Sequence, residues 1–204
     1  MPGYRTCYNL AETPVGPFGT TAGGGGGSPI FDLLPLRSTQ IKPTDVPLIS
    51  SLITRFHELP MNSQLRSQAA LHRLAQAKGR LNYGDVALDL GIALEMLLLN
   101  AEHEGQELPG QLTLHFRLRG SWLIAETSEE RRSIFKTLGN IYSLRSQIAH
   151  NGFSEKLDKM EHAKREAMLT EHIAVGERIV QRLILQGIPN DWTAIVLGDK
   201  KPQA

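Results

Sequence analysis

A stripe of isoleucine and leucine at helical spacing, interrupted by one arginine, is the feature that most constrains this fold. The stripe holds Ile134, Leu138, Ile141 and Ile148. Because a helix turns about 100° per residue, these side chains fall within roughly 80° of one another, and Arg145 falls among them. An arginine on a core-facing stripe costs free energy unless it is paired or faces a cleft or a partner. The stripe therefore predicts a packed helix whose arginine has a defined role.

Helical periodicity continues along most of the chain and predicts an all-α bundle of about five to six helices. Residues that cap helices, together with prolines and glycines, mark where the segments end. One segment is apolar almost all round, which is typical of a helix in the middle of a bundle; it spans about residues 83–101. The predicted helices span about residues 44–59, 62–79, 83–101, 111–125, 128–150 and 154–186, with a short segment at 192–197.

The first 40 residues differ in composition from the rest. They contain five prolines and the glycine run 23–27, which no Lys-Ser/Thr pair follows as a phosphate-binding loop requires. Such a composition buries little surface, so we expect residues 1–40 to be a flexible tail or linker. Residues 41–198 are then the helical domain, and 199–204 a disordered C-terminus.

Bulk properties exclude several classes of protein. The 204 residues carry a net charge of +1, and a single cysteine, Cys7, excludes an internal disulfide framework. The N-terminus lacks the basic start and apolar stretch of a signal peptide. The longest apolar run, residues 93–99, is interrupted by Glu95 and is too short to cross a bilayer. We expect a cytoplasmic protein without membrane partners.

Two more predicted helices carry a charge on the apolar face. Glu95 lies within the stripe of segment 83–101, and Arg119 lies within that of segment 111–125. Three successive helices with charges of mixed sign predict a buried or half-buried polar cluster, because buried charges are stable mainly when paired. We expect Glu95 to pair with Arg119, with Arg145 or with both.

A histidine near the end of the same helix suggests chemistry. Arg145 and His150 are about 140° apart around a continuous helix, so they meet only in two ways. Either the helix frays near Ala149, or a two-fold dimer brings two such pairs to one cleft. Histidine can move a proton near neutrality and arginine can hold a phosphate. Metal-free cleavage of RNA by its own ribose 2′-hydroxyl needs those two roles.

Ligand classes can be narrowed further. The seven histidines show no pair at a metal-ligand spacing such as HxxxH, so we predict no metal and no cofactor. Between residues 111 and 150, six Lys and Arg stand against three Glu, which favours an anionic partner there. Tyr142 and Trp122 are the nearby aromatic residues on which a base could stack.

The segment 80–152 resembles the Apea-like branch of the HEPN domains (higher eukaryotes and prokaryotes nucleotide-binding). Four stretches carry the resemblance, in the family's order and at roughly its spacing. They are RLNYGDVALDLGIALE (80–95), LTLHFRLRGSWLI (112–124), IFK (134–136) and IYSLRSQIAHNG (141–152). The resemblance implies an all-helical bundle that forms a homodimer. In active members, the arginine and histidine of the last stretch form a metal-independent endoribonuclease site at the dimer interface.

Carried over to this chain, the resemblance implies catalytic Arg145 and His150, and Glu95 and Arg119 match further polar positions of its pattern. We expect Glu95, Arg119, Ser146 and Asn151 to form a polar cluster that supports the site. Ser146 departs from the family, because ribonuclease members often have Asn, Asp or His after the arginine, and serine carries no charge.

Two hypotheses about function follow from the sequence. The chain binds RNA or a nucleotide, with or without cleaving it. Alternatively, it is a non-catalytic structural or protein-interaction module in which the Arg/Glu cluster only stabilises the bundle or dimer.

Overall fold

The structure confirms the all-α class, with no β-strand in the described residues. The computed structural model describes residues 41–99, 109–189 and 192–196, so the predicted tail 1–40 and C-terminus 199–204 lie outside it. A 3-10 turn, Pro43–Asp45, leads into the first helix. The helices are α1 (Val46–Glu58), α2 (Met61–Gly79), α3 (Tyr83–Leu98), α4 (Pro109–Ile124), α5 (Ser128–Asn151), α6 (Glu155–Asp158), α7 (His162–Gln186) and α8 (Trp192–Val196).

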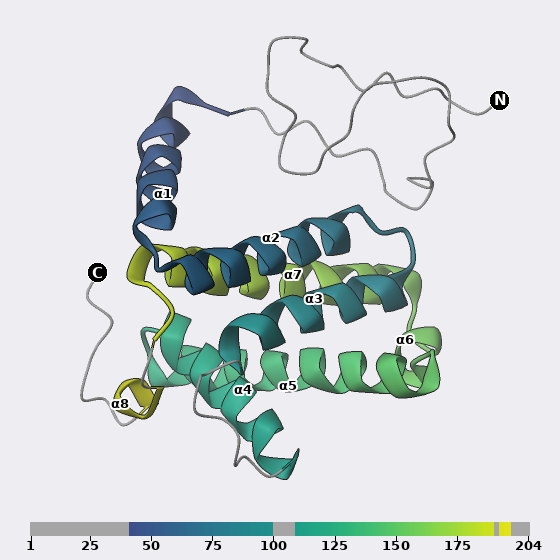
Figure 1. Cartoon of the computed structure of the whole chain (residues 1–204). Coiled ribbons are helices and arrows are strands. Elements are labelled where there is room, and N and C mark those ends of the chain that lie inside the picture. Colours follow the sequence, from purple (N-terminus) through teal and green to yellow (C-terminus); the bar gives the residue numbers. More distant parts are fainter. Residues whose placement is uncertain (1–40, 100–108, 190–191, 197–204) are drawn as a thin grey trace, which may run out of the picture. The chain divides into compact units, whose positions relative to one another are not determined.

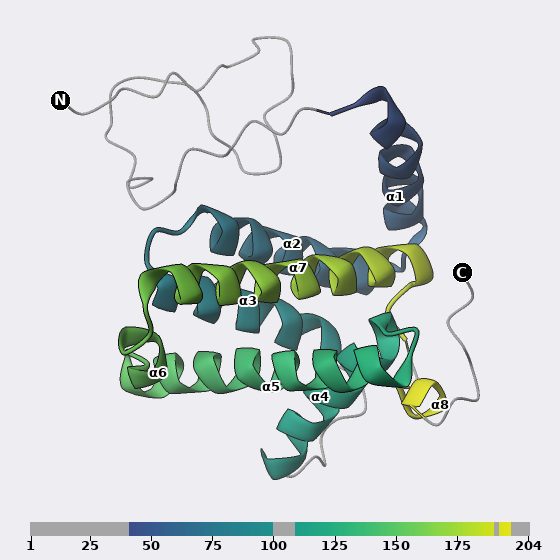
Figure 2. The same ribbon diagram turned by 180° about the vertical axis from the view of Figure 1, so that it is seen from behind.

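Helix α3 lies at the centre of the bundle. It packs against α2, α4, α5 and α7. Figures 1 and 2 show α2, α3, α5 and α7 side by side, with α4 crossing obliquely. Nine of the sixteen residues of α3 are buried, among them Leu90 and Leu94 with no exposed surface. The central position predicted from its nearly uniform apolar surface is therefore confirmed.

The apolar core is continuous and draws on most of the helices. Phe116 of α4, Leu138 of α5 and Leu183 of α7 are fully buried within it. Helix α1 has no buried residue and rests against α7, with Leu52 and Phe56 partly covered. No helix within the described part of the chain is both long and apolar enough to cross a membrane.

The N-terminus of α5 is fixed by its own polar side chains. The Thr127 hydroxyl accepts a hydrogen bond from the Glu130 backbone N–H at 3.1 Å. The Glu130 carboxylate in turn accepts one from the Glu126 backbone N–H at 2.9 Å. Reciprocal capping of this kind satisfies donors that the first turn leaves open, so α5 begins at Ser128, where the sequence predicted it.

Helix α5 continues without interruption to Asn151. It ends at Gly152, which adopts a left-handed conformation with φ of 78° and donates its N–H to the Ile148 carbonyl at 2.8 Å. Glycine adopts this conformation without steric cost, which makes it the common residue after a helix end. The fraying near Ala149 that would turn His150 toward Arg145 does not occur.

The long final helix predicted over residues 154–186 is wrong, because it consists of α6 and α7 with a break at 159–161. Two contacts explain the break. Leu157 is buried, which turns the short α6 inward. The Arg165 guanidinium donates to the carbonyls of Met160 at 2.6 Å and Asp158 at 3.3 Å. These bonds satisfy carbonyls at the break and make the turn stable.

His172 on α7 is an ionisable residue buried in the core, and its pKa is strongly perturbed. It is 2% exposed. Burial lowers the pKa of His172 to about 4, while Glu171 opposes the shift and Lys156 adds to it. The folded protein therefore holds this histidine neutral, whereas the unfolded chain protonates it at its ordinary value of 6.5.

We predict that acid weakens the fold through His172. As pH falls from about 6.5 to 4, the unfolded chain binds a proton that the folded protein does not. The free energy of unfolding should drop by about 3 kcal/mol from this group. Urea unfolding at stepped pH values measures the slope, which His172→Gln should reduce and the exposed His57→Gln should leave as in wild type. Equal slopes in wild type and His172→Gln would contradict the assignment.

Candidate functional site

The predicted pairing of Glu95 with an arginine is found between α3 and α5. The Arg145 Nη2 atom lies 2.5 Å from the Glu95 Oε2 atom. The two side chains retain 27% and 18% of their exposure, so the pair sits at the margin of the core rather than inside it. Arg145 therefore reaches solvent while one side of its guanidinium is held.

A glycine on α3 leaves the room that the Arg145 side chain needs to reach Glu95. A Cβ at Gly91 would overlap the Arg145 Cβ and lie 2.5 Å from its Cγ, so the arginine stem runs directly over the α3 backbone. Gly91 and Glu95 are four residues apart and lie on the same face of α3. The glycine thus admits the stem, and the glutamate one turn later receives the guanidinium.

The charge of Arg145 does not fully offset the cost of burying the Glu95 carboxylate. Burial raises the pKa of Glu95, and the opposing charge and hydrogen bond of Arg145 do not cancel the effect. The Arg145 Nε atom is buried and has no hydrogen-bond partner among the residues that the structure describes. A ligand could reach only the exposed part of the guanidinium, not the buried Nε.

Arg119 serves a different contact from the one expected. It is buried on α4 and donates from Nη1 to the Leu98 carbonyl at 2.7 Å. Its guanidinium also lies 5.6 Å from the centre of the Trp192 ring of α8. Leu98 is the last residue of α3, where carbonyls lack helical partners and a cation is favourable. Arg119 thus closes the C-terminal end of α3, and Arg145 is the partner of Glu95.

The remaining residues of the predicted site are spread around α5. His150 and Asn151 are exposed in its last turn, and Ser146 is half-buried. Because α5 is continuous, the side chains of Arg145 and His150 point about 140° apart. One copy of the chain therefore brings Arg145 to Glu95 but does not bring His150 to Arg145.

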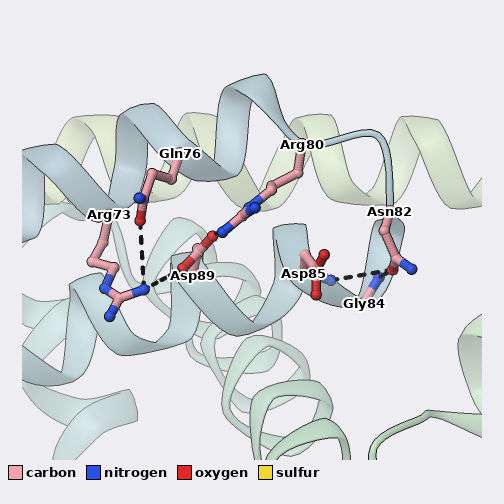
Figure 3. A network of polar contacts seen from close by, with 7 residues as sticks. All are labelled: Arg73, Gln76, Arg80, Asn82, Gly84, Asp85 and Asp89. Atoms are coloured by element: carbon pink, nitrogen blue, oxygen red, sulfur yellow. Dashed lines mark hydrogen bonds and ion pairs between the residues drawn. The ribbon is translucent and has the colours of Figure 1, made fainter. Parts of the chain in front are cut away.

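A second charged cluster, which the sequence analysis missed, joins α3 to α2 (Figure 3). Asp89 is buried and accepts from Arg73 Nη1 at 2.8 Å and from Arg80 Nε at 3.1 Å. The Asp89 side chain is 4% exposed, whereas those of Arg73 and Arg80 are 41% and 25% exposed. Two arginines on one buried carboxylate leave this cluster with a net positive charge next to solvent.

One signal could have found this cluster. Asp89 is a charged residue between two leucines in a segment that is otherwise nearly all apolar. An acidic residue in such a segment needs a cation, and Arg80 lies only nine residues earlier, across the turn from α2 to α3. The same turn holds Asn82, whose side-chain oxygen accepts from the N–H groups of Gly84 and Asp85 (Figure 3).

No metal-ligand cluster occurs within the described residues, in which His, Cys, Asp and Glu nowhere gather in threes. His103 and Cys7 lie outside those residues. Comparison of the chain with models of protein families, with curated proteins and with solved structures finds no match. Any function must therefore be argued from the geometry of α3 and α5.

We predict that Gly91→Ala destabilises the fold although alanine favours helices. The new methyl group would overlap the Arg145 stem and separate α3 from α5, so the free energy of unfolding should fall by about 1–3 kcal/mol. Chemical unfolding measures this change. Gly139→Ala in α5 is the control, because its nearest neighbour is the side-chain Arg117 Nε at 3.0 Å, and it should cost less. A Gly91→Ala protein as stable as wild type would contradict the close packing of Arg145 on α3.

Proposed function

We propose that this chain is an RNA-binding domain of the Apea-like HEPN type, in which Arg145 and His150 act on the RNA backbone. The observation that carries the proposal is how Arg145 is held. Its stem lies on Gly91, one edge of its guanidinium pairs with Glu95, and 27% of the side chain stays exposed. An arginine fixed in this way can offer its remaining donors to a phosphate with little loss of conformational entropy.

Completion of the site by a second copy is part of the proposal. Within one chain the directions of Arg145 and His150 differ by about 140°, so one phosphate does not meet both side chains from the same protomer. A two-fold axis along this face of α5 would place His150 of one copy opposite Arg145 of the other. Two-fold interfaces are self-complementary, so one such contact would create two equivalent sites.

The two side chains would supply complementary steps of RNA cleavage. His150 takes the proton from the ribose 2′-hydroxyl, whose oxygen attacks the adjacent phosphorus. Arg145 stabilises the additional negative charge on the phosphate oxygens. The bond to the 5′-oxygen breaks, and that oxygen takes up a proton. The products are a 2′,3′-cyclic phosphate and a 5′-hydroxyl. Ser146 carries no charge, so these steps depend on His150 and Arg145.

A second candidate function is a structural or interaction module, and one observation favours it. Each of the three predicted charges already has a partner inside the bundle: Glu95 and Arg145 hold each other, and Arg119 holds the Leu98 carbonyl. Such contacts fix how helices pack and need no ligand. The two candidate functions differ in the role of the exposed His150, which takes part in RNA cleavage in the first and has no catalytic role in the second.

We predict that the purified protein cleaves mixed-sequence RNA in EDTA and that His150→Ala lowers the rate at least about 100-fold. Arg145→Lys keeps a cation beside Glu95 but loses the planar fork, so it should also weaken RNA binding and cleavage. Gel analysis of the products and binding titrations measure both effects. His57→Ala and Arg132→Ala, both at exposed positions, are the controls.

The melting temperature of every variant is measured alongside. Binding that depends on Arg145 without cleavage would keep the RNA-binding proposal and remove the catalytic part. Absence of RNA binding by the wild-type protein, with normal folding, would contradict the proposal and leave the structural module.

A further inference from the structure

The C-terminal end of α5 carries an open hollow of about 470 Å³. Its lining residues come from the last turns of α5, from the turn that follows and from α6: Gln147, Asn151, Phe153, Glu155 and Lys156. His150 does not line the hollow, but it occupies the same last turn of α5 as Asn151, which does. Its walls are mainly polar, with one aromatic ring.

That ring, Phe153, is exposed without a packing role that explains it. It keeps 54% of its surface in solvent although it directly follows the left-handed Gly152, which turns the chain away from α5. An exposed aromatic ring can stack on the flat face of a nucleobase.

The aromatic residues that the sequence suggested for base stacking are already in use. Tyr142 is half-buried, with its ring 5.3 Å from that of the buried Phe116. The Arg131 guanidinium covers the Trp122 ring at 3.6 Å from its centre. Of the three aromatic residues Tyr142, Trp122 and Phe153, it is therefore Phe153 whose ring face is open for a nucleobase to stack on.

Some polar side chains that line the hollow already have hydrogen-bond partners within the protein, and Asn151 does not among the described residues. The Gln147 amide bonds to Ser143 at 3.3 Å and to Ser154 at 2.8 Å, so both its ends are engaged. The Lys156 ammonium donates to Asn140 at 3.1 Å. No side-chain hydrogen bond of Asn151 is found with any residue that the structure describes. Its amide offers a donor and an acceptor side by side, as the edge of a nucleobase requires.

We propose that Phe153 and Asn151 form a subsite for one unpaired nucleobase, which rests on the proposed function and gives it a preference for single-stranded RNA. The base stacks on the Phe153 ring, and the Asn151 amide hydrogen-bonds its polar edge. Asn151 and His150 are adjacent in the last turn, so a base held here has its ribose and phosphate near His150. Duplex RNA cannot use the subsite, because its bases are stacked and paired.

Binding of matched single-stranded and duplex RNA tests the subsite. The single strand carries 2-aminopurine at one position at a time, since stacking on an aromatic ring quenches the fluorescence of this base. Wild type should bind the single strand with quenching at one position. Phe153→Ala should weaken that binding about 5- to 100-fold and abolish the quenching. Phe153→Trp should retain both, Asn151→Ala should weaken binding with quenching kept, and duplex affinity should stay unchanged in all three.

Leu114→Ala is the matched control, because this exposed apolar residue lies on α4 and should change nothing. If Phe153→Ala binds single-stranded RNA as wild type does, while Arg145→Lys binds it less, the subsite is wrong and the proposed function stands. If wild type binds no RNA, the proposed function itself fails. If Phe153→Ala instead abolishes dimers in sedimentation and leaves affinity per protomer unchanged, the hollow is an interface between copies, and the subsite is again wrong.

Discussion

The ion pair between Glu95 and Arg145, with the arginine stem lying on Gly91, is the constraint on which the arrangement of α3 and α5 depends. A charged side chain on an apolar stripe admits few positions, because its polar end must meet a partner and its stem must find room. Gly91 leaves room for the arginine stem, and Glu95, one turn later on α3, pairs with the guanidinium. The two contacts together fix the position of α5 along α3, and therefore the position of His150.

The central helix uses polar contacts to hold three neighbours. Asp89 binds Arg73 of α2 and Arg80 of the turn that follows α2. Glu95 binds Arg145 of α5, and the Leu98 carbonyl accepts from Arg119 of α4. Apolar packing alone tolerates small shifts of one helix against another, whereas a hydrogen-bonded charge does not. We infer that these contacts specify the register of the bundle more than they add to its stability, in line with the usual balance for buried ion pairs.

Much of this could be predicted from the sequence. Apolar periodicity gave the helices, and the charge in each stripe gave the pairing of Glu95 with an arginine, because both depend on local spacing. The partners of Asp89 were missed. Arg73 lies on another helix, where periodicity within one segment does not reveal it, whereas the isolated charge of Asp89 and the nearby Arg80 could have indicated the other contact. The break before α7 depends on the contact of Arg165 with carbonyls of the preceding turn. Phe153 was overlooked because its exposure follows from how the turn after α5 leaves the bundle.

The central claim is that Glu95 and Arg145 are coupled and that their coupling holds α3 to α5. A double-mutant cycle on the free energy of unfolding tests it most directly, with Glu95→Ala, Arg145→Ala and the double variant measured at neutral pH. The account predicts that the double variant loses less than the sum of the single losses, with a coupling of about 1 to 3 kcal/mol. Additive losses, within about 0.3 kcal/mol, would contradict it.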